Sequence, residues 1–139
     1  MAVIKETTMA NILHKGKVRD TYDIGNNELL MIATDRISAF DLVLPTAIPK
    51  KGTVLNQMSA FWFNKTSHVI PNHFVCFATE REELSLPLDV ARRGMVVRKA
   101  ERIDVECVVR GYITGSAWSE YRKQGTISGE FVGEGLQEC

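Results

Sequence analysis

Hydrophobic and polar residues alternate along the first part of the chain in the manner of β-strands. Residues 12–24 alternate irregularly and end at Gly25-Asn26-Asn27, and the apolar run 28–34 follows directly. Two such runs around a Gly-Asn-Asn turn predict a β-hairpin. Residues 35–41 then form a polar break, and residues 42–44 predict a short strand.

The pattern next changes to that of a helix. From Thr53 to about His68, apolar residues recur at spacings of three and four, which predicts a helix. Thr53 is the candidate cap of its first turn, and Pro71 is expected to end it. We expect the aromatic residues 61–63 to pack in the core or against the helix.

The remainder predicts strands, one loop and a second helix. Three further apolar runs predict strands: 74–78, 95–100 and 105–113. Residues 80–94 are charged and contain proline and glycine, so they predict a loop with at most a short turn of helix. A second helix is predicted over about 115–123, with Thr114 as its candidate cap and Gly125 as its stop.

Composition narrows the range of functions. The chain has 139 residues, and its 17 Lys and Arg balance its 17 Asp and Glu. A neutral chain argues against general binding to nucleic acid or to membrane surfaces. The N-terminus lacks the apolar core of a secretion signal, and three widely separated cysteines form no disulfide or metal framework. These features favour a reducing compartment, and we expect a cytoplasmic protein.

The first candidate for chemistry lies around Gly16. If residues 12–24 form one strand, Lys15, Lys17 and Arg19 share one face, because strand side chains alternate. Cations beside a glycine suit a polyphosphate. The alternative is a solvated edge strand, since lysines commonly protect sheet edges. The Gly-x-x-x-x-Gly-Lys-Ser/Thr phosphate loop is absent from the sequence.

Two further candidates flank the first helix. The polar break carries two carboxylates, an arginine and a hydroxyl that could together bind a polar ligand: Asp35, Arg36, Ser38 and Asp41. The alternative is a local turn in which Asp35 or Ser38 bonds its own backbone. Lys50 and Lys51 precede the helix, where free backbone N–H groups can hold a phosphate. The alternative for these lysines is a solvated basic turn.

The most informative stretch is residues 103–118. Arg110 ends its apolar run, where an unpaired charge is costly, so it needs an anionic ligand or a protein carboxylate. Glu106 lies on the same strand face and is the alternative, structural partner of Arg110. Ser116 follows near a helix start, where its hydroxyl could bind a ligand or cap the helix.

Four blocks, taken in order, resemble the SAICAR synthase family of ATP-dependent ligases (phosphoribosylaminoimidazole-succinocarboxamide synthases). The blocks are Gly16–Asp20, Asp35–Asp41, Lys51–Phe63 and Glu106–Trp118. Asp104 departs from the family pattern, which more often has proline there. The family's second signature, Asp-x-Lys-x-Glu-Phe-Gly, which brings acidic magnesium ligands, has no match here.

The resemblance implies an α+β fold in two parts. Residues 1–100 are expected to form an antiparallel sheet with one helix, similar to the small lobe of a kinase. Residues 101–139 are expected to begin an ATP-grasp-like α+β domain, incomplete in this chain. ATP, with Mg²⁺, would lie between the two parts.

The resemblance also implies a role for each candidate residue. Lys17 and Arg19 would contact the ATP phosphates, and Lys51 would bind substrate. Four residues of the segment that links the two parts would lie beside the adenine of ATP and bind the nucleotide: Arg98, Lys99, Glu101 and Arg102. Ser38 and Asp41 would belong to the loop that binds carboxyaminoimidazole ribotide. Arg110 and Ser116 would contact that ribotide, and Asp41, Arg110 and Ser116 would serve catalysis.

The implied reaction joins L-aspartate to carboxyaminoimidazole ribotide through an acyl phosphate made from ATP, giving SAICAR, ADP and phosphate. Because no metal ligands are expected within this chain, we do not expect it to be a competent ligase alone. The alternatives are a non-catalytic ATP-binding fragment and one half of a split enzyme. A phosphate-transferring kinase is disfavoured, because the Asp-Phe-Gly and His-Arg-Asp motifs are absent from the sequence. The sequence is compatible with a homo-oligomer.

Overall fold

The computed structural model describes residues 3–101, 103–105, 107, 109 and 111–138. The chain divides into two compact units, Met1–Glu101 and Arg102–Cys139. Among the described residues, no helix is both long and apolar enough to cross a membrane.

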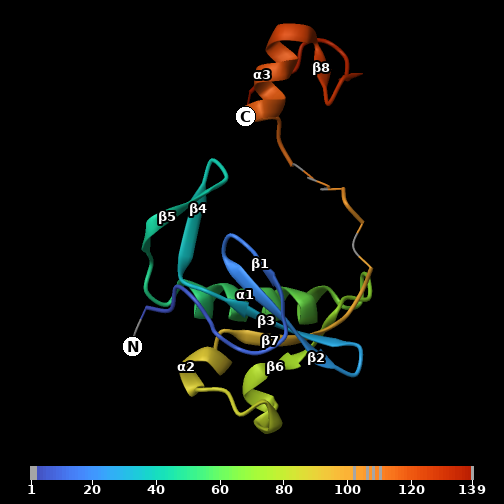
Figure 1. Ribbon diagram of the computed structural model, residues 1–139. Helices are drawn as coiled ribbons and strands as arrows, with labels where there is room; N and C mark the ends of the chain where they lie inside the picture. Colours follow the sequence, from blue (N-terminus) through green and yellow to red (C-terminus); the bar gives the residue numbers. More distant parts are fainter. Residues whose placement is uncertain (1–2, 102, 106, 108, 110, 139) are drawn as a thin grey trace. The chain divides into compact units, whose positions relative to one another are not determined.

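The first unit is built on a five-stranded antiparallel sheet in the order β1-β2-β3-β7-β6 (Figure 1). Its strands are β1 (Ile12–Lys15), β2 (Arg19–Gly25), β3 (Glu28–Ala33), β6 (Phe74–Phe77) and β7 (Gly94–Arg98). The hairpin predicted around Gly25-Asn26-Asn27 is confirmed as β2–β3. Asn26 and Asn27 have φ values of 52° and 59°, a left-handed conformation that asparagine tolerates better than most residues.

The predicted single strand over residues 12–24 is wrong. Residues 16–18 form a turn, and β1 and β2 on either side of it pair as an antiparallel hairpin, with Lys15 opposite Asp20. Alternation therefore does not place Lys15, Lys17 and Arg19 on one face. The alternation of apolar and polar residues is irregular over 12–24 because this turn interrupts the strand.

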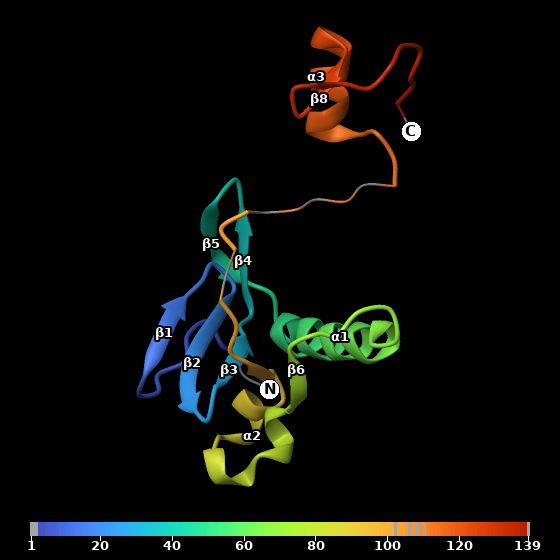
Figure 2. The ribbon, with the colours of Figure 1, turned by 90° about the vertical axis from the view of Figure 1, so that its right-hand side faces the viewer.

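The helix α1 (Lys51–Thr66) contacts β3, β6 and β7, and Figure 2 shows it standing to one side of the sheet. Its buried residues are Gly52, Asn56 and Ala60, four residues apart. These small side chains let the helix approach the sheet closely. The larger Phe61 and Trp62 are consequently turned outward and are more than half exposed. Of the two placements expected, the core is therefore wrong for them, and they pack edge-on against each other on the helix.

The capping and end signals predicted for this helix are also corrected. The helix begins two residues before Thr53, with Lys50 at the cap position and no side-chain capping bond. It ends at Thr66, well before Pro71. The start is instead fixed by the distant carboxylate of Asp35, which accepts a hydrogen bond from the Gly52 N–H.

Short helical turns connect β6 to β7. They are the 3₁₀ turns η1 (Ala78–Glu80) and η2 (Glu82–Leu84) and the one-turn helix α2 (Leu88–Ala91). Leu84, Leu86 and Val90 from this segment pack on the core of Tyr22, Leu30, Ile32 and Ala78. The prediction of a loop with little helix over 80–94 is close to what the structure has.

A separate hairpin, β4 (Arg36–Ala39) and β5 (Leu42–Ala47), projects beyond the five-stranded sheet in both views (Figures 1 and 2). The predicted polar break is therefore a strand over most of its length. Its two-residue tip, Phe40-Asp41, has φ values of 48° and 65°. The hairpin escaped prediction because neither tip residue is the glycine or asparagine that usually marks such a turn.

The second unit contains α3 (Gly115–Gln124) and a small hairpin of β8 (Thr126–Ile127) and β9 (Glu130–Phe131). Gly125, with φ of 72°, ends α3 as predicted. Thr114 is at the cap position, but its side chain makes no capping bond.

The strand predicted over 105–113 is wrong for the residues that the structure describes there, because 105, 107, 109 and 111–113 are not in a strand. A strand exists only where another backbone supplies the ladder of hydrogen bonds. Among the described residues, none pairs with this segment.

Candidate functional site

The turn between β1 and β2 carries the first candidate cation. The Gly16 N–H donates to the Arg19 carbonyl oxygen at 2.7 Å and closes the turn. A Cβ at Gly16 would stand only 3.0 Å from that same oxygen, so this close turn favours glycine. Lys17 follows in the turn, and its ammonium donates to the carboxylate of Asp41 at the tip of the β4–β5 hairpin.

The pair of Lys17 and Asp41 brings together two residues predicted for different ligands. Both side chains are largely exposed, at 52% and 91%, so the pair contributes little to stability. The hydrogen bond from Lys17 nevertheless lowers the pKa of the Asp41 carboxyl below its ordinary value. An anionic ligand at Lys17 would compete directly with Asp41.

Arg19 and Lys51 are both close to Ala33, the last residue of β3. Arg19 is directly opposite Ala33 in the β2–β3 ladder. The start of α1 lies against that residue too, because a Cβ at Gly52 would stand 2.1 Å from the Ala33 carbonyl oxygen. The two residues are therefore neighbours where the helix contacts the sheet, and Arg19 is close enough to lower the pKa of Lys51.

The charge on Lys51 is poorly compensated. Burial and repulsion from Arg19 and Arg36 lower the pKa of its ammonium, and attraction to Asp35 only partly offsets them. Arg19 also contributes, after burial, to the lowered pKa of His73. Cations that repel one another at a partly buried position are the arrangement expected of an anion site.

The backbone at the start of α1 is already engaged. The Gly52 N–H donates to Asp35 Oδ1 at 2.9 Å, and the Lys51 N–H donates to the Ile48 carbonyl. These two N–H groups are therefore not free to bind a phosphate. The basic turn before the helix had suggested that they would be. The contribution that Lys51 can make to a ligand is its ammonium.

Asp35, one of the two carboxylates of the predicted polar break, organises this part of the unit. Its fully buried carboxylate accepts hydrogen bonds from Ile4 N–H at 2.9 Å, from Gly52 N–H and from Arg93 Nη1 at 2.8 Å. Burial raises the pKa of Asp35, but these bonds and the Arg93 charge outweigh it and lower the pKa below its ordinary value. The signal available was the Asp-Arg pair that follows an apolar strand.

The remaining predicted residues of the first unit are spread over exposed positions. Ser38 is exposed on β4, opposite Val43. Arg98 ends β7, and Lys99 donates to Asp23 at 2.8 Å, which ties the link to β2. Glu101 is exposed, and Arg102 lies outside the described residues.

The second unit holds an open cavity of about 490 Å³, lined in part by Tyr112, Ser116, Glu120 and Ser128. Ser116 is the second residue of α3 and is exposed. Glu120 accepts hydrogen bonds from the Thr126 hydroxyl at 2.8 Å and the Gly129 N–H at 2.9 Å, which fixes the hairpin β8–β9 beside the cavity. Arg110 and Glu106, whose predicted roles or pairing concern this region, lie outside the described residues.

Comparison with known proteins identifies the family of this chain. The family model described as SAICAR synthetase matches residues 12–138. The chain belongs to the SAICAR synthetase family. The predicted family resemblance and the α+β fold are thereby confirmed.

The relatives agree along almost the whole chain. A phosphoribosylaminoimidazole-succinocarboxamide synthase of Elusimicrobium minutum is 52% identical over 92% of this chain and 45% of its own length. The protein of the same name from Nitrosomonas europaea is 47% identical over 99% of the chain and 48% of its own length. This chain therefore spans about half the length of the relatives that it matches.

Solved structures show the same fold. A structure named SAICAR synthase, 38% identical, superposes with a TM-score of 0.85 over 97% of this chain and 50% of its own. The enzyme of Saccharomyces cerevisiae, solved as a complex with SAICAR, is 39% identical with the same TM-score, and covers 97% of this chain and 50% of its own.

Proposed function

We propose that this chain supplies the phosphate-binding and ribotide-binding part of an ATP-dependent ligase that joins L-aspartate to carboxyaminoimidazole ribotide. The observation that carries the proposal is the family match over residues 12–138. On this fold Arg19 and Lys51 are the first residues of β2 and α1, and Lys17 lies in the turn just before β2. The S. cerevisiae relative, solved with the product SAICAR, supports the choice of product.

In the proposed reaction, ATP supplies the phosphoryl group that converts the imidazole carboxylate into an acyl phosphate. The aspartate amine then attacks the acyl carbon, the C–N bond forms, and phosphate leaves. The site must hold negative oxygens in place while charge shifts between them, which is the task of fixed cations. Lys17 and Arg19 serve the ATP phosphates in this proposal.

The other predicted residues keep the roles that the resemblance implies. Lys51, Ser38, Arg110 and Ser116 serve the ribotide, and Asp41 joins them once a phosphate displaces its carboxylate from Lys17. Arg110 and Ser116, with Asp41, would also align the reacting carboxylate. The link residues are proposed to lie beside the adenine: Arg98, Lys99, Glu101 and Arg102.

Magnesium is proposed to arrive with ATP. Among the described residues, no three or more histidine, cysteine, aspartate or glutamate side chains gather as a metal site. Asp41, the exposed carboxylate nearest Lys17, is already paired. Following the resemblance, we assign Mg²⁺ to acidic residues of the family's second signature, Asp-x-Lys-x-Glu-Phe-Gly, which has no match in this sequence. We also propose a cytoplasmic location, consistent with free Cys76 and Cys107.

The test compares two proteins. One is the 139-residue chain, and the other is a chimera of residues 1–139 joined to the C-terminal half of the E. minutum relative. Phosphate release that requires ATP, aspartate and ribotide together is expected from the chimera and not from the chain alone. Turnover by the chain alone would mean that its own carboxylates hold the metal. A folded chimera without ribotide-dependent turnover would refute the proposed function.

A further inference from the structure

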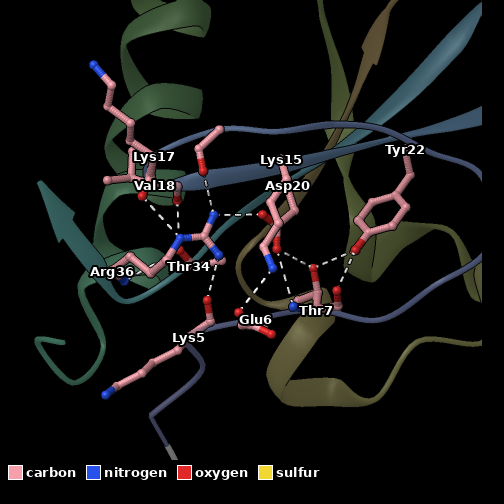
Figure 3. Close-up of polar contacts among 11 residues, drawn as sticks. Lys5, Glu6, Thr7, Lys15, Lys17, Val18, Asp20, Tyr22, Thr34 and Arg36 are labelled. Carbon is pink, nitrogen blue, oxygen red and sulfur yellow. Dashed lines mark hydrogen bonds and ion pairs between the residues drawn. The ribbon is translucent and has the colours of Figure 1, made fainter. Parts of the chain in front are cut away.

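A buried arginine, Arg36, lies beneath the Gly16–Val18 turn and binds its backbone (Figure 3). Its Nε donates to the Lys17 carbonyl oxygen at 3.1 Å, and its Nη2 donates to the Gly16 carbonyl oxygen at 2.8 Å. Its Nη1 donates to the carbonyl oxygen of Lys5. Arg36 is the first residue of β4, and its guanidinium therefore binds β4 to both the turn and the N-terminal segment.

The charge of Arg36 is balanced by Asp20 at 2.7 Å, and the Asp20 side chain is fully buried. Asp20 also accepts from the Thr7 hydroxyl at 2.8 Å, and that hydroxyl lies 2.7 Å from the Tyr22 hydroxyl. Burial raises the pKa of Asp20, but the hydrogen bonds from Arg36 and Thr7 and the Arg36 charge outweigh it and hold the pKa low. Breaking such a pair is costly because it strands a buried charge.

The direction of the two carbonyls decides what the turn presents to solvent. In a trans peptide the C=O and the following N–H point in opposite directions. Because Arg36 draws in the carbonyls of Gly16 and Lys17, the N–H groups of Lys17 and Val18 point away from it. No described residue accepts a hydrogen bond from either N–H. Two successive outward N–H groups in a turn are donors that one anion can accept from together.

We propose that Arg36 is the positioning residue of the phosphate site: it holds the turn so that the Lys17 and Val18 N–H groups face the phosphate oxygens of ATP. The inference rests on the proposed function for the identity of the ligand. The Lys17 side chain extends away from Arg36 in Figure 3, and its ammonium is paired with the exposed carboxylate of Asp41, which a phosphate would displace. Arg36 acts through the backbone and does not itself touch the ligand.

The substitution Arg36→Lys separates positioning from charge. Lysine keeps the positive charge beside Asp20, but one ammonium cannot reproduce the planar fork that spans both turn carbonyls. Arg81→Lys is the matched control. Arg81 binds Glu28 through Nη2 at 2.9 and 3.1 Å, and Glu28 begins β3 at the end of the hairpin remote from Gly16.

Kinetics of the chimera give the first readout. Arg36→Lys is expected to raise the KM for ATP at least about tenfold, the loss expected when charge-assisted contacts are removed. The KM for ribotide should stay at its wild-type value. Arg81→Lys should leave both KM values unchanged. All assays run below the melting temperature of each variant.

Amide hydrogen exchange of the 139-residue chain gives the second readout and needs no nucleotide. The Gly16 amide should exchange faster in Arg36→Lys, while the amides of Leu30 and Ile32 in the core strand keep their wild-type rates. A merely destabilised fold would speed all three. If Arg36→Lys does not fold, Asp20→Asn replaces it, with the same expected pattern in exchange and in the KM for ATP.

The outcomes distinguish this inference from the proposed function. A wild-type chimera that does not use ATP refutes the proposed function and, with it, the ligand assigned to the turn. A wild-type chimera that uses ATP, with an unchanged KM for ATP in Arg36→Lys, overturns the role of Arg36 alone. A rise confined to the KM for ribotide would assign Arg36 to the β4–β5 hairpin instead and would overturn the inference as well.

Discussion

Replacing Gly52 by alanine tests the contact between α1 and the sheet. Judged by helix propensity alone, glycine to alanine inside a helix should stabilise the protein by up to about 1 kcal/mol. The structure predicts the opposite sign. A Cβ at this position would stand 2.1 Å from the carbonyl oxygen of Ala33 and 2.8 Å from Arg93 Nη1. The first of these atoms belongs to the backbone of β3 and cannot rotate away.

The magnitude follows from what must move. The helix start must withdraw by about 1 Å to bring the contact near the shortest separations that Cβ atoms tolerate. That shift stretches the hydrogen bond from Gly52 N–H to Asp35, now 2.9 Å, and disturbs the buried Arg93–Asp35 pair at 2.8 Å. Overpacking costs about 1–3 kcal/mol and a disturbed buried pair costs more. We expect a net loss of about 2–4 kcal/mol in the free energy of unfolding.

The assay is thermal and urea unfolding of the 139-residue chain, followed by circular dichroism. A loss of this size should lower Tm by about 10 °C or more in a unit of roughly 100 residues. Gln57→Ala, at an exposed position of the same helix, is the control and should leave Tm nearly unchanged. A Gly52→Ala protein at least as stable as the wild type would refute the packing argument.

Other predictions concern the cations, the ribotide and acid stability. In the chimera, Arg19→Ala should raise the ATP dissociation constant about tenfold or more, because a charge-assisted contact contributes about 1.5–3 kcal/mol; unchanged affinity in the Lys17→Ala, Arg19→Ala double variant would contradict the phosphate assignment. Arg110→Lys should raise the KM for ribotide, since lysine lacks the two-pronged donor set; a loss confined to the KM for ATP would assign Arg110 to the other ligand. The folded-state pKa values of Asp20 and Asp35 lie below the unfolded value of 3.8, so the stability that they contribute is present above that pH and is lost as the pH falls below it. Urea titrations from neutral pH to pH 3 should therefore show a falling free energy of unfolding, and Asp20→Asn should make that acid-dependent fall smaller; an equal fall in both proteins would argue against the Asp20 network.

Local patterns in the sequence decided much of the secondary structure. The β2–β3 hairpin followed from two apolar runs around Gly25-Asn26-Asn27, and the end of α3 followed from Gly125. These features are set by residues a few positions apart, so a window of sequence contains their cause. The ordered blocks of residues also sufficed to indicate the family, because the identity of a motif does not depend on its geometry.

Contacts between distant residues decided what the sequence could not. The buried face of α1 is the one with Gly52, Asn56 and Ala60, since Gly52 has no side chain to meet Ala33 and Asn56 donates to the Gly94 carbonyl. This turned Phe61 and Trp62 outward. Helical periodicity identifies a helix but does not say which side meets the sheet.

The candidate site shows the same division. Lys17 and Arg19 could be chosen from the sequence because cations beside a glycine suit a phosphate. The sequence also offered Arg36, as the arginine of a polar loop, but its contact with the turn could not be predicted. That contact depends on carbonyls nearly twenty positions earlier, which the chain brings over Arg36 only when β2 pairs with β3. Residue types that can bind an anion are determined by the sequence. The direction in which the backbone presents its N–H groups is decided by the tertiary structure, since a buried charge takes whatever partners the fold places within reach.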